Sequence, residues 1–101
     1  MFIERNVFHL KFGLAKQALV LWKEYLRKVQ ITDQHIHARL LTDITGRGYT
    51  IVLELSYDNF ADLEPARCLL TKQDGWKEFY QQFIPLCEYA ERTQYKLELI
   101  Y

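Results

Sequence analysis

The period with which apolar residues recur changes several times along this chain, and the order of those changes constrains the fold more than any other feature. Residues 2–12 alternate between apolar and other side chains, with Phe8 and Leu10 on the same side, which predicts a strand. From residue 14 to residue 30 the apolar residues instead recur at helical spacing, with charged residues opposite them. That segment is predicted to be an amphipathic helix.

Two more alternating runs, residues 35–44 and residues 49–57, lie on either side of the segment Thr45-Gly46-Arg47-Gly48. Two glycines between alternating runs are typical of a β-hairpin. A loop over residues 32–34 leads into the first run. The middle of the chain is therefore predicted to form two antiparallel strands.

A second helical region is predicted after the hairpin. Asp58-Asn59 can cap a short helix over residues 60–63, which Pro65 interrupts or restarts. A longer helix follows, and Pro85 is expected to bend it. Its apolar stripe consists of Trp76, Phe79, Tyr80, Phe83, Cys87 and Ala90. A last strand is predicted at the end of the chain, with an apolar side made of Tyr95, Leu97, Leu99 and Tyr101.

The resulting order, βαββαβ, is that of the ferredoxin-like α+β fold. In this fold an antiparallel four-stranded sheet carries two helices on one face. A chain of 101 residues has room for one hydrophobic core, and no linker or repeat divides it. We therefore expect a single ferredoxin-like domain over residues 1–101.

Composition and charge exclude several classes of partner. Thirteen basic residues balance thirteen acidic ones, whereas nucleic-acid binding usually needs a basic excess. The first residues do not form a charged segment followed by a long apolar one, and no apolar run approaches the length of about 18 residues needed to span a membrane. We expect a cytoplasmic protein without a nucleic-acid or membrane partner. Cys68 and Cys87 are interpreted as inert buried thiols.

The predicted sheet has one apolar face and one mixed face. Facing the helices we expect Phe8, Leu10, Phe12, Ile36, Ala38, Leu40, Tyr49, Ile51, Leu53, Leu55, Leu97 and Leu99. On the opposite face we expect Ile3, Arg5, Val7, His9, His37, Arg39, Leu41, Thr50, Val52, Glu54, Lys96, Glu98 and Ile100. The second set is too charged for a dry core and too apolar for a bare surface. Either this face is solvated, with cross-strand ion pairs such as Arg39–Glu54, or a second subunit covers it and encloses a partly polar cavity.

The apolar content favours the second arrangement. Half of the residues are apolar and 15% are aromatic, which is generous for a small core. Ala15, Leu19 and Leu26 also widen the stripe of the first helix beyond what one sheet face requires. Because monomers rarely expose large apolar patches, we expect a homodimer with two-fold symmetry.

Scattered residues along the chain resemble the NIPSNAP-type domains of the dimeric α/β-barrel superfamily. The matching residues are Glu4, Phe8, Leu10, Lys11 and Gly13 in the opening strand, the segment from Gly48 to Tyr57-Asp58, and Arg67, Leu70, Trp76, Phe79 and Pro85-Leu86 in the second helical region. The chain departs from the family where an arginine is usual in the first strand, because Asn6 stands there with Arg5 beside it. Phe12 replaces a common proline. The resemblance implies a dimeric α/β barrel, and related antibiotic-biosynthesis-monooxygenase-like barrels bind aromatic substrates without a cofactor.

Six residues are candidates for binding a ligand. His and Glu side chains offer acid–base groups, and Arg can hold a carboxylate or an enolate. The candidates are Arg5, His9, His37, Arg39 and Glu54 on the mixed face, with Trp76, beside Tyr80, at the mouth of the pocket. The favoured alternative is that the polar residues form an ion-pair network that aligns two subunits, and that Trp76 belongs to the core.

No metal or cofactor is predicted. His35 and His37 lie two positions apart and could bind a metal together with His9. The alternative is that His35 lies in the loop and His37 is an ordinary polar residue of the sheet face, since neither a further ligand nor a supporting second shell is evident. No catalytic residue can be assigned either. The functional prediction is a small-molecule-binding or enzymatic barrel with a small aromatic or apolar ligand, in its most concrete form a cofactor-free monooxygenase. The alternative is a non-enzymatic interaction or assembly module with a packed interior.

Overall fold

The computed structural model describes residues 1–29, 31 and 35–101. The predicted loop over residues 32–34 and the predicted end of the first helix at residue 30 lie outside the described residues. The elements in chain order are β1 (Phe2–Leu10), α1 (Ala15–Lys28), β2 (Ile36–Thr42), β3 (Thr50–Tyr57), the 3₁₀ turn η1 (Phe60–Asp62), α2 (Leu63–Thr71), α3 (Trp76–Phe83), the 3₁₀ turn η2 (Ile84–Leu86) and β4 (Cys87–Lys96).

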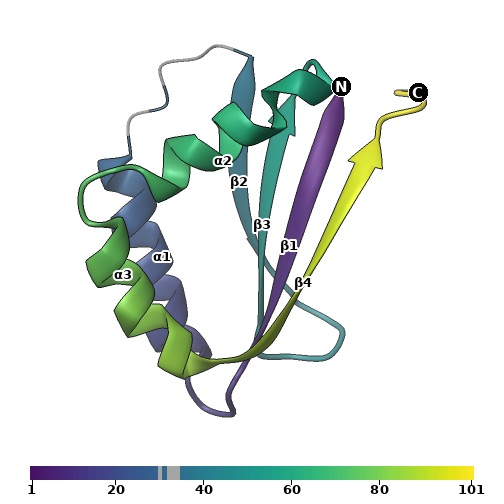
Figure 1. Ribbon diagram of the computed structural model, residues 1–101. Coiled ribbons are helices and arrows are strands. Elements are labelled where there is room, and N and C mark those ends of the chain that lie inside the picture. Colours follow the sequence, from purple (N-terminus) through teal and green to yellow (C-terminus); the bar gives the residue numbers. More distant parts are fainter. Residues whose placement is uncertain (30, 32–34) are drawn as a thin grey trace.

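The strands form one antiparallel sheet in the order β2-β3-β1-β4. The three α-helices lie on one side of this sheet, and its other side is left bare (Figure 1). We call the bare side the outer face. This arrangement confirms the predicted ferredoxin-like α+β fold. None of the helices in the described part of the chain is long and apolar enough to cross a membrane.

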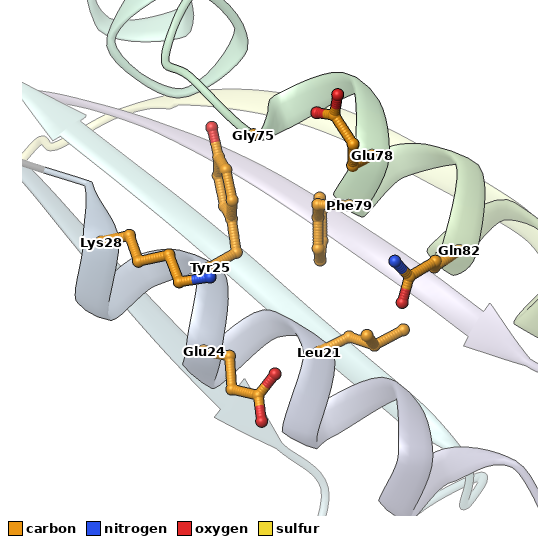
Figure 2. Close-up of a pocket in the computed structure, with 8 residues that line it drawn as sticks. All are labelled: Leu21, Glu24, Tyr25, Lys28, Gly75, Glu78, Phe79 and Gln82. Atoms are coloured by element: carbon orange, nitrogen blue, oxygen red, sulfur yellow. The ribbon is translucent and has the colours of Figure 1, made fainter.

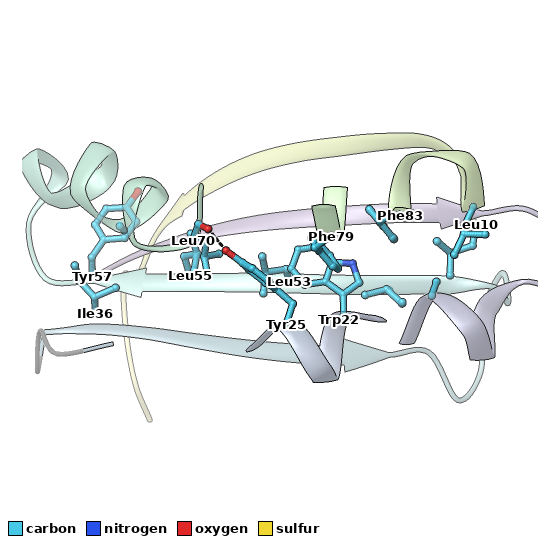
Figure 3. Packing of buried hydrophobic residues seen from close by; sticks show 14 residues of the cluster. Leu10, Trp22, Tyr25, Ile36, Leu53, Leu55, Tyr57, Leu70, Phe79 and Phe83 are labelled. Atoms are coloured by element: carbon cyan, nitrogen blue, oxygen red, sulfur yellow. Dashed lines mark hydrogen bonds between the residues drawn. The ribbon is translucent and has the colours of Figure 1, made fainter. Parts of the chain in front are cut away.

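Aromatic side chains pack among aliphatic ones in the core between the sheet and the helices (Figure 3). The rings of Trp22 and Phe79 lie 4.6 Å apart and those of Tyr25 and Phe79 lie 4.7 Å apart, so α1 and α3 meet through aromatic contacts. The hydroxyl of Tyr25 donates a hydrogen bond to the backbone carbonyl of Leu70, which ties α1 to α2. These contacts set the position of the helices above the sheet.

The region from residue 74 to the end of the chain differs from the prediction. The last helix was expected to continue past Pro85 to Ala90, but α3 ends at Phe83 and β4 begins at Cys87. Proline cannot donate a backbone hydrogen bond, and it stands here in the 3₁₀ turn that separates helix from strand. The residues after this turn pair with β1 instead of extending the helix.

The predicted last strand is present, but it begins and ends earlier than expected, because β4 spans Cys87–Lys96. Lys96 pairs with Phe2, the first residue of β1, and the backbone N–H of Leu97 donates to the carbonyl oxygen of Met1 over 2.9 Å. Beyond that point the described chain forms no further strand, although Leu97 and Leu99 alternate in sequence. Leu99 is 73% exposed. The assignment of residues 97–100 to the two sheet faces fails for this reason, whereas Lys96, expected on the outer face, pairs with Phe2, which packs against the core.

Two other residues assigned to the apolar face lie beyond the strand ends. Phe12 and Tyr49 are exposed and contact each other, with ring centroids 5.1 Å apart. The short helix predicted after Asn59 is confirmed as η1, and the backbone N–H of Asn59 donates to Asp62 Oδ2 over 3.3 Å. Pro65 lies in the first turn of α2, where a missing N–H does not break the helix.

Candidate functional site

A pocket of 130 Å³ lies between the sheet and the helices. Its lining comes from β1, β3, β4 and all three helices, and consists of Glu4, Asn6, Phe8, Trp22, Leu53, Leu55, Arg67, Leu70, Thr71, Trp76, Tyr80 and Arg92. Pockets for drug-sized ligands usually measure about 300–1,000 Å³. This pocket therefore suits a small ligand, of the order of a single ring.

A buried carboxylate stands at one end of the pocket. Side chains alternate along a strand, so Glu4 points to the same side as Asn6 and Phe8, toward the helices. Glu4 is only 1% exposed. A buried charge of this kind requires a partner, and α2 supplies it with Arg67.

The Glu4–Arg67 contact uses two guanidinium nitrogens. Arg67 Nε and Nη2 both donate to Glu4 Oε1, over 2.8 Å and 2.5 Å. Gln94 Nε2 donates to the same oxygen over 3.4 Å. The hydrogen bond to Glu4 raises the pKa of Arg67, so the guanidinium stays charged.

A second polar pair lies beside the first. Asn6 on β1 is the direct neighbour of Arg92 on β4, and Arg92 Nε donates to Asn6 Oδ1 over 2.9 Å. Arg92 Nε also lies 3.7 Å from Glu4 Oε1. Arg92 is 58% exposed, so it stands at the rim of the pocket with its guanidinium held in place by Asn6.

Aromatic side chains form the opposite wall. Trp76 and Tyr80 stand one turn apart on α3 and stack with ring centroids 5.1 Å apart. Trp22 is 2% exposed, and its indole N–H has no hydrogen-bond acceptor among the described residues. Leaving such a donor buried and unpaired costs roughly 1–3 kcal/mol, so Trp22 brings an unsatisfied donor to the residues that line the pocket.

Five of the six candidates from the sequence lie on the outer face rather than in this pocket. Arg5, Glu54 and Arg39 are direct neighbours across β1, β3 and β2. Arg5 Nη2 lies 2.7 Å from Glu54 Oε2, and Arg39 bonds the other carboxylate oxygen. The predicted Arg39–Glu54 ion pair is thus present. Burial by itself raises the pKa of Glu54, but hydrogen bonds and charge from the two arginines outweigh it and lower the pKa below its ordinary value.

The histidines are spread over the outer face and its edge. The ring of His9 stacks on Tyr89 at 4.3 Å, and His37 is exposed opposite Ser56. His35 Nδ1 lies 2.6 Å from Asp58 Oδ2. Within residues 1–29, 31 and 35–101, no three potential metal ligands come together.

Of the sequence-predicted candidates, Trp76 lines the pocket. The charged residues of the pocket, Glu4, Arg67 and Arg92, and the amide of Asn6 were not predicted as site residues. One signal was available: Glu4 and Asn6 interrupt an otherwise apolar side of the first strand. Arg92 could not be found in this way, because residues up to 90 were expected to be helical.

A second depression lies on the surface between α1 and α3 (Figure 2). It has a volume of 390 Å³, with Tyr25 and Phe79 at its base and Glu24, Lys28 and Glu78 around it. The hydroxyl of Tyr25 already bonds Leu70. The charged side chains around this groove are exposed, whereas the first pocket holds the buried carboxylate of Glu4.

The two cysteines are half-buried rather than fully buried as expected. Burial raises the pKa of Cys87, and its Sγ lies 3.5 Å from the carbonyl oxygen of His9. A raised pKa keeps the side chain in the unreactive thiol form.

The element order and the helix-covered sheet define a ferredoxin-like α+β domain. No protein-family model and no curated protein matches the chain. Solved structures match it over nearly its whole length. A NIPSNAP domain protein from Burkholderia xenovorans has a TM-score of 0.77 and 19% identity, covering 97% of this chain and 95% of that one.

Two further structures show the same fold. A NIPSNAP family protein from Agrobacterium tumefaciens has a TM-score of 0.79 and 16% identity, covering 96% of this chain and 85% of that one. A candidate antibiotic biosynthesis monooxygenase from Chloroflexus aurantiacus has a TM-score of 0.71 and 10% identity, with coverage of 99% and 95%. At these identities the similarity concerns the fold, and at that level it confirms the resemblance noted in the sequence.

Proposed function

We propose that this protein is a homodimeric small-molecule-binding protein that takes its ligand in the pocket between the sheet and the helices. The observation that carries the proposal is that one small pocket with aromatic walls is lined by the Glu4–Arg67 ion pair, whose carboxylate is buried, and by Trp22, whose indole N–H has no acceptor among the described residues. Concave sites with a few convergent polar groups in an apolar lining are typical of ligand-binding sites.

The presence of the Glu4–Arg67 ion pair is better explained by a role in ligand binding than by a contribution to stability. Replacing a buried ion pair by apolar residues of similar size is often neutral or stabilising. A chain of 101 residues with a small core gains little stability from placing Glu4 and Arg67 there. A role in recognising a polar ligand explains why charged residues line a pocket that also has aromatic and aliphatic walls.

The outer face supports the homodimer. Leu41, Val52 and Val7 are direct neighbours across β2, β3 and β1, and they form an apolar row beside the charged row of Arg39, Glu54 and Arg5. Glu54 is only 3% exposed although no helix covers it. A second copy of the same face, related by a two-fold axis, would bury the apolar row. In this arrangement the charged row aligns the two subunits, and the ligand site lies within each subunit.

An enzymatic form of the proposal is a cofactor-free oxygenase. The fold similarity to monooxygenase-type proteins supports it. Such chemistry needs a group that removes a proton from the substrate, and Glu4 is the carboxylate that lines the pocket. Glu4 is already engaged by Arg67, which donates two hydrogen bonds to one of its carboxylate oxygens. Binding is therefore the primary proposal, and catalysis the secondary one.

A ligand screen tests the proposal. Single-ring aromatic acids, phenols and amides would be screened by ligand-observed NMR against the wild type, Trp76→Leu and Arg92→Gln. The matched control is Arg27→Gln, which removes an exposed arginine of α1 outside the pocket. Hits that persist in the control and weaken in both pocket variants are expected. A screen without hits, or hits that none of these substitutions changes, would instead favour an assembly module with a packed interior.

A further inference from the structure

We propose that the ligand of this pocket is a small aromatic monoanion, a carboxylate or a phenolate, held by the guanidinium of Arg92 and the indole N–H of Trp22. This inference rests on the proposed function and specifies its ligand class. It follows from the charge of the pocket, from the donors that remain unused and from the shape of the walls.

The charged side chains that line the pocket carry a net positive charge. The described residues of the pocket include one carboxylate, Glu4, and two guanidinium groups, Arg67 and Arg92. One positive charge is therefore left over. In a partly buried site such an excess favours a ligand with one negative charge and disfavours a cation.

Arg67 and Arg92 differ in how many of their N–H donors still lack an acceptor. Arg67 already uses Nε and Nη2 on Glu4. Arg92 uses Nε on Asn6, and its two terminal amino groups have no hydrogen-bond partner among the described residues. The excess charge thus lies on Arg92, which can present both terminal amino groups to an anion.

The second unused group is also a donor. An indole N–H and a guanidinium can donate hydrogen bonds but cannot accept them. The N–H of Trp22 is buried in the lining without an acceptor within the described residues. A carboxylate or phenolate oxygen satisfies both kinds of group at once. A ligand that presents N–H groups cannot.

The walls and the volume of the pocket determine the size and the apolar part of the ligand. Trp76 and Tyr80 present stacked rings on one side, and Leu53 and Leu55 present aliphatic groups from β3 on the other. A volume of 130 Å³ accommodates a single planar ring but leaves no room for a polycyclic body. The ligand is therefore a compact aromatic ring with one acidic group.

The experiment compares four probes of nearly equal shape: benzoate, benzyl alcohol, benzamide and benzamidine, the first an anion and the last a cation at pH 7. Affinities are measured by NMR titration of the ¹⁵N-labelled protein. The indole N–H signal of Trp22 is assigned by its absence in Trp22→Phe. Benzoate is expected to bind at least about tenfold more tightly than the two neutral probes, as a charge-assisted hydrogen bond predicts, and benzamidine to bind most weakly.

The variants locate the contacts. Arg92→Gln is expected to weaken benzoate binding about tenfold or more while the affinity for benzyl alcohol changes little. Arg27→Gln should leave both affinities unchanged. Benzoate should also shift the indole N–H signal of Trp22. The same signal can be followed in Arg92→Gln, because that substitution lies at the rim of the pocket and leaves Trp22 in place.

The outcomes separate the two proposals. Equal binding of benzoate and benzamide, or benzoate binding that leaves the Trp22 signal in place, would overturn the ligand class while the pocket remained a binding site. Failure of all four probes to bind would overturn both the ligand class and the small-molecule-binding function.

Discussion

Asn6 and Arg92 are paired across β1 and β4, and the hydrogen bond from Arg92 Nε to Asn6 Oδ1 spans 2.9 Å on the helix-covered side of the sheet. Because Arg92 on the edge strand β4 lies directly beside Asn6, its guanidinium reaches the rim of the pocket. Because Asn6 Nδ2 also reaches the carbonyl oxygen of Leu53 over 3.5 Å, the amide is fixed between two neighbouring strands. Asn6 thereby positions the guanidinium of Arg92.

Replacing Asn6 by Ala should release Arg92 without removing its charge. We expect the affinity for benzoate to fall several-fold and the free energy of unfolding to fall by about 1 kcal/mol, the usual worth of a hydrogen bond. NMR titration and urea unfolding measure the two effects. Thr93→Ala, on the outer face of the same strand, is the control. Unchanged benzoate affinity in Asn6→Ala would contradict the positioning role.

Breaking the Glu4–Arg67 pair should be costly. Arg67→Met leaves Glu4 as a buried charge without its main partner, which is expected to lower the free energy of unfolding by roughly 3 kcal/mol. The double variant Glu4→Met/Arg67→Met should recover most of that loss, because no charge is then stranded. Denaturant unfolding of the two single variants and the double variant forms a double-mutant cycle, with Arg27→Met as the surface control. A double variant no more stable than Arg67→Met would show that the pair is needed for folding.

The stability of the protein should depend on pH through Glu54. The pKa of Glu54 is lower in the folded chain than its ordinary value of 4.5, because Arg5 and Arg39 outweigh the effect of burial. The folded chain therefore binds fewer protons than the unfolded chain in this range. The ion pair stabilises the fold fully above the ordinary pKa, and this contribution disappears as the pH falls through the lower folded value.

The test is the free energy of unfolding measured between neutral and acidic pH. Glu54→Gln should be less stable than the wild type at neutral pH, and the difference should shrink as the solution is acidified. Glu88→Gln, at an exposed position of β4, should run parallel to the wild type. A constant difference between Glu54→Gln and the wild type at every pH would contradict the lowered pKa.

The homodimer can be tested in the apolar row of the outer face. Val52 lies at the centre of this row, between Val7 and Leu41. Val52→Lys places a charge without a partner in the proposed interface, so we expect a dimer for the wild type and a monomer for the variant in sedimentation experiments at micromolar concentration. Val20→Lys, on the exposed side of α1, should remain dimeric. A monomeric wild type at high micromolar concentration would exclude the dimer.

The sequence alone determined the type and order of most elements. In β1 and β3 the alternation of side chains follows the burial found in the structure, except at Glu54, which is buried on the outer face. The helical stripe of α1 contains its buried Ala18, Trp22 and Tyr25. These patterns are local: whether a residue faces the core depends on the period of its own element. The cross-strand contact between Arg39 and Glu54 could be predicted because two strands joined by a hairpin leave few choices of register.

The tertiary structure decided where the last helix ends and where the site lies. Cys87 and Ala90 fit a helical stripe as well as a strand, and their pairing with β1 selects the strand. That choice brings Arg92 beside Asn6, and the path of α2 brings Arg67 to Glu4. Arg67 and Glu4 are 63 positions apart, and Arg92 and Asn6 are 86 apart. Periodicity reports only the side on which a residue lies within its own element, so contacts over such separations form only when strand pairing and helix packing place the elements against one another.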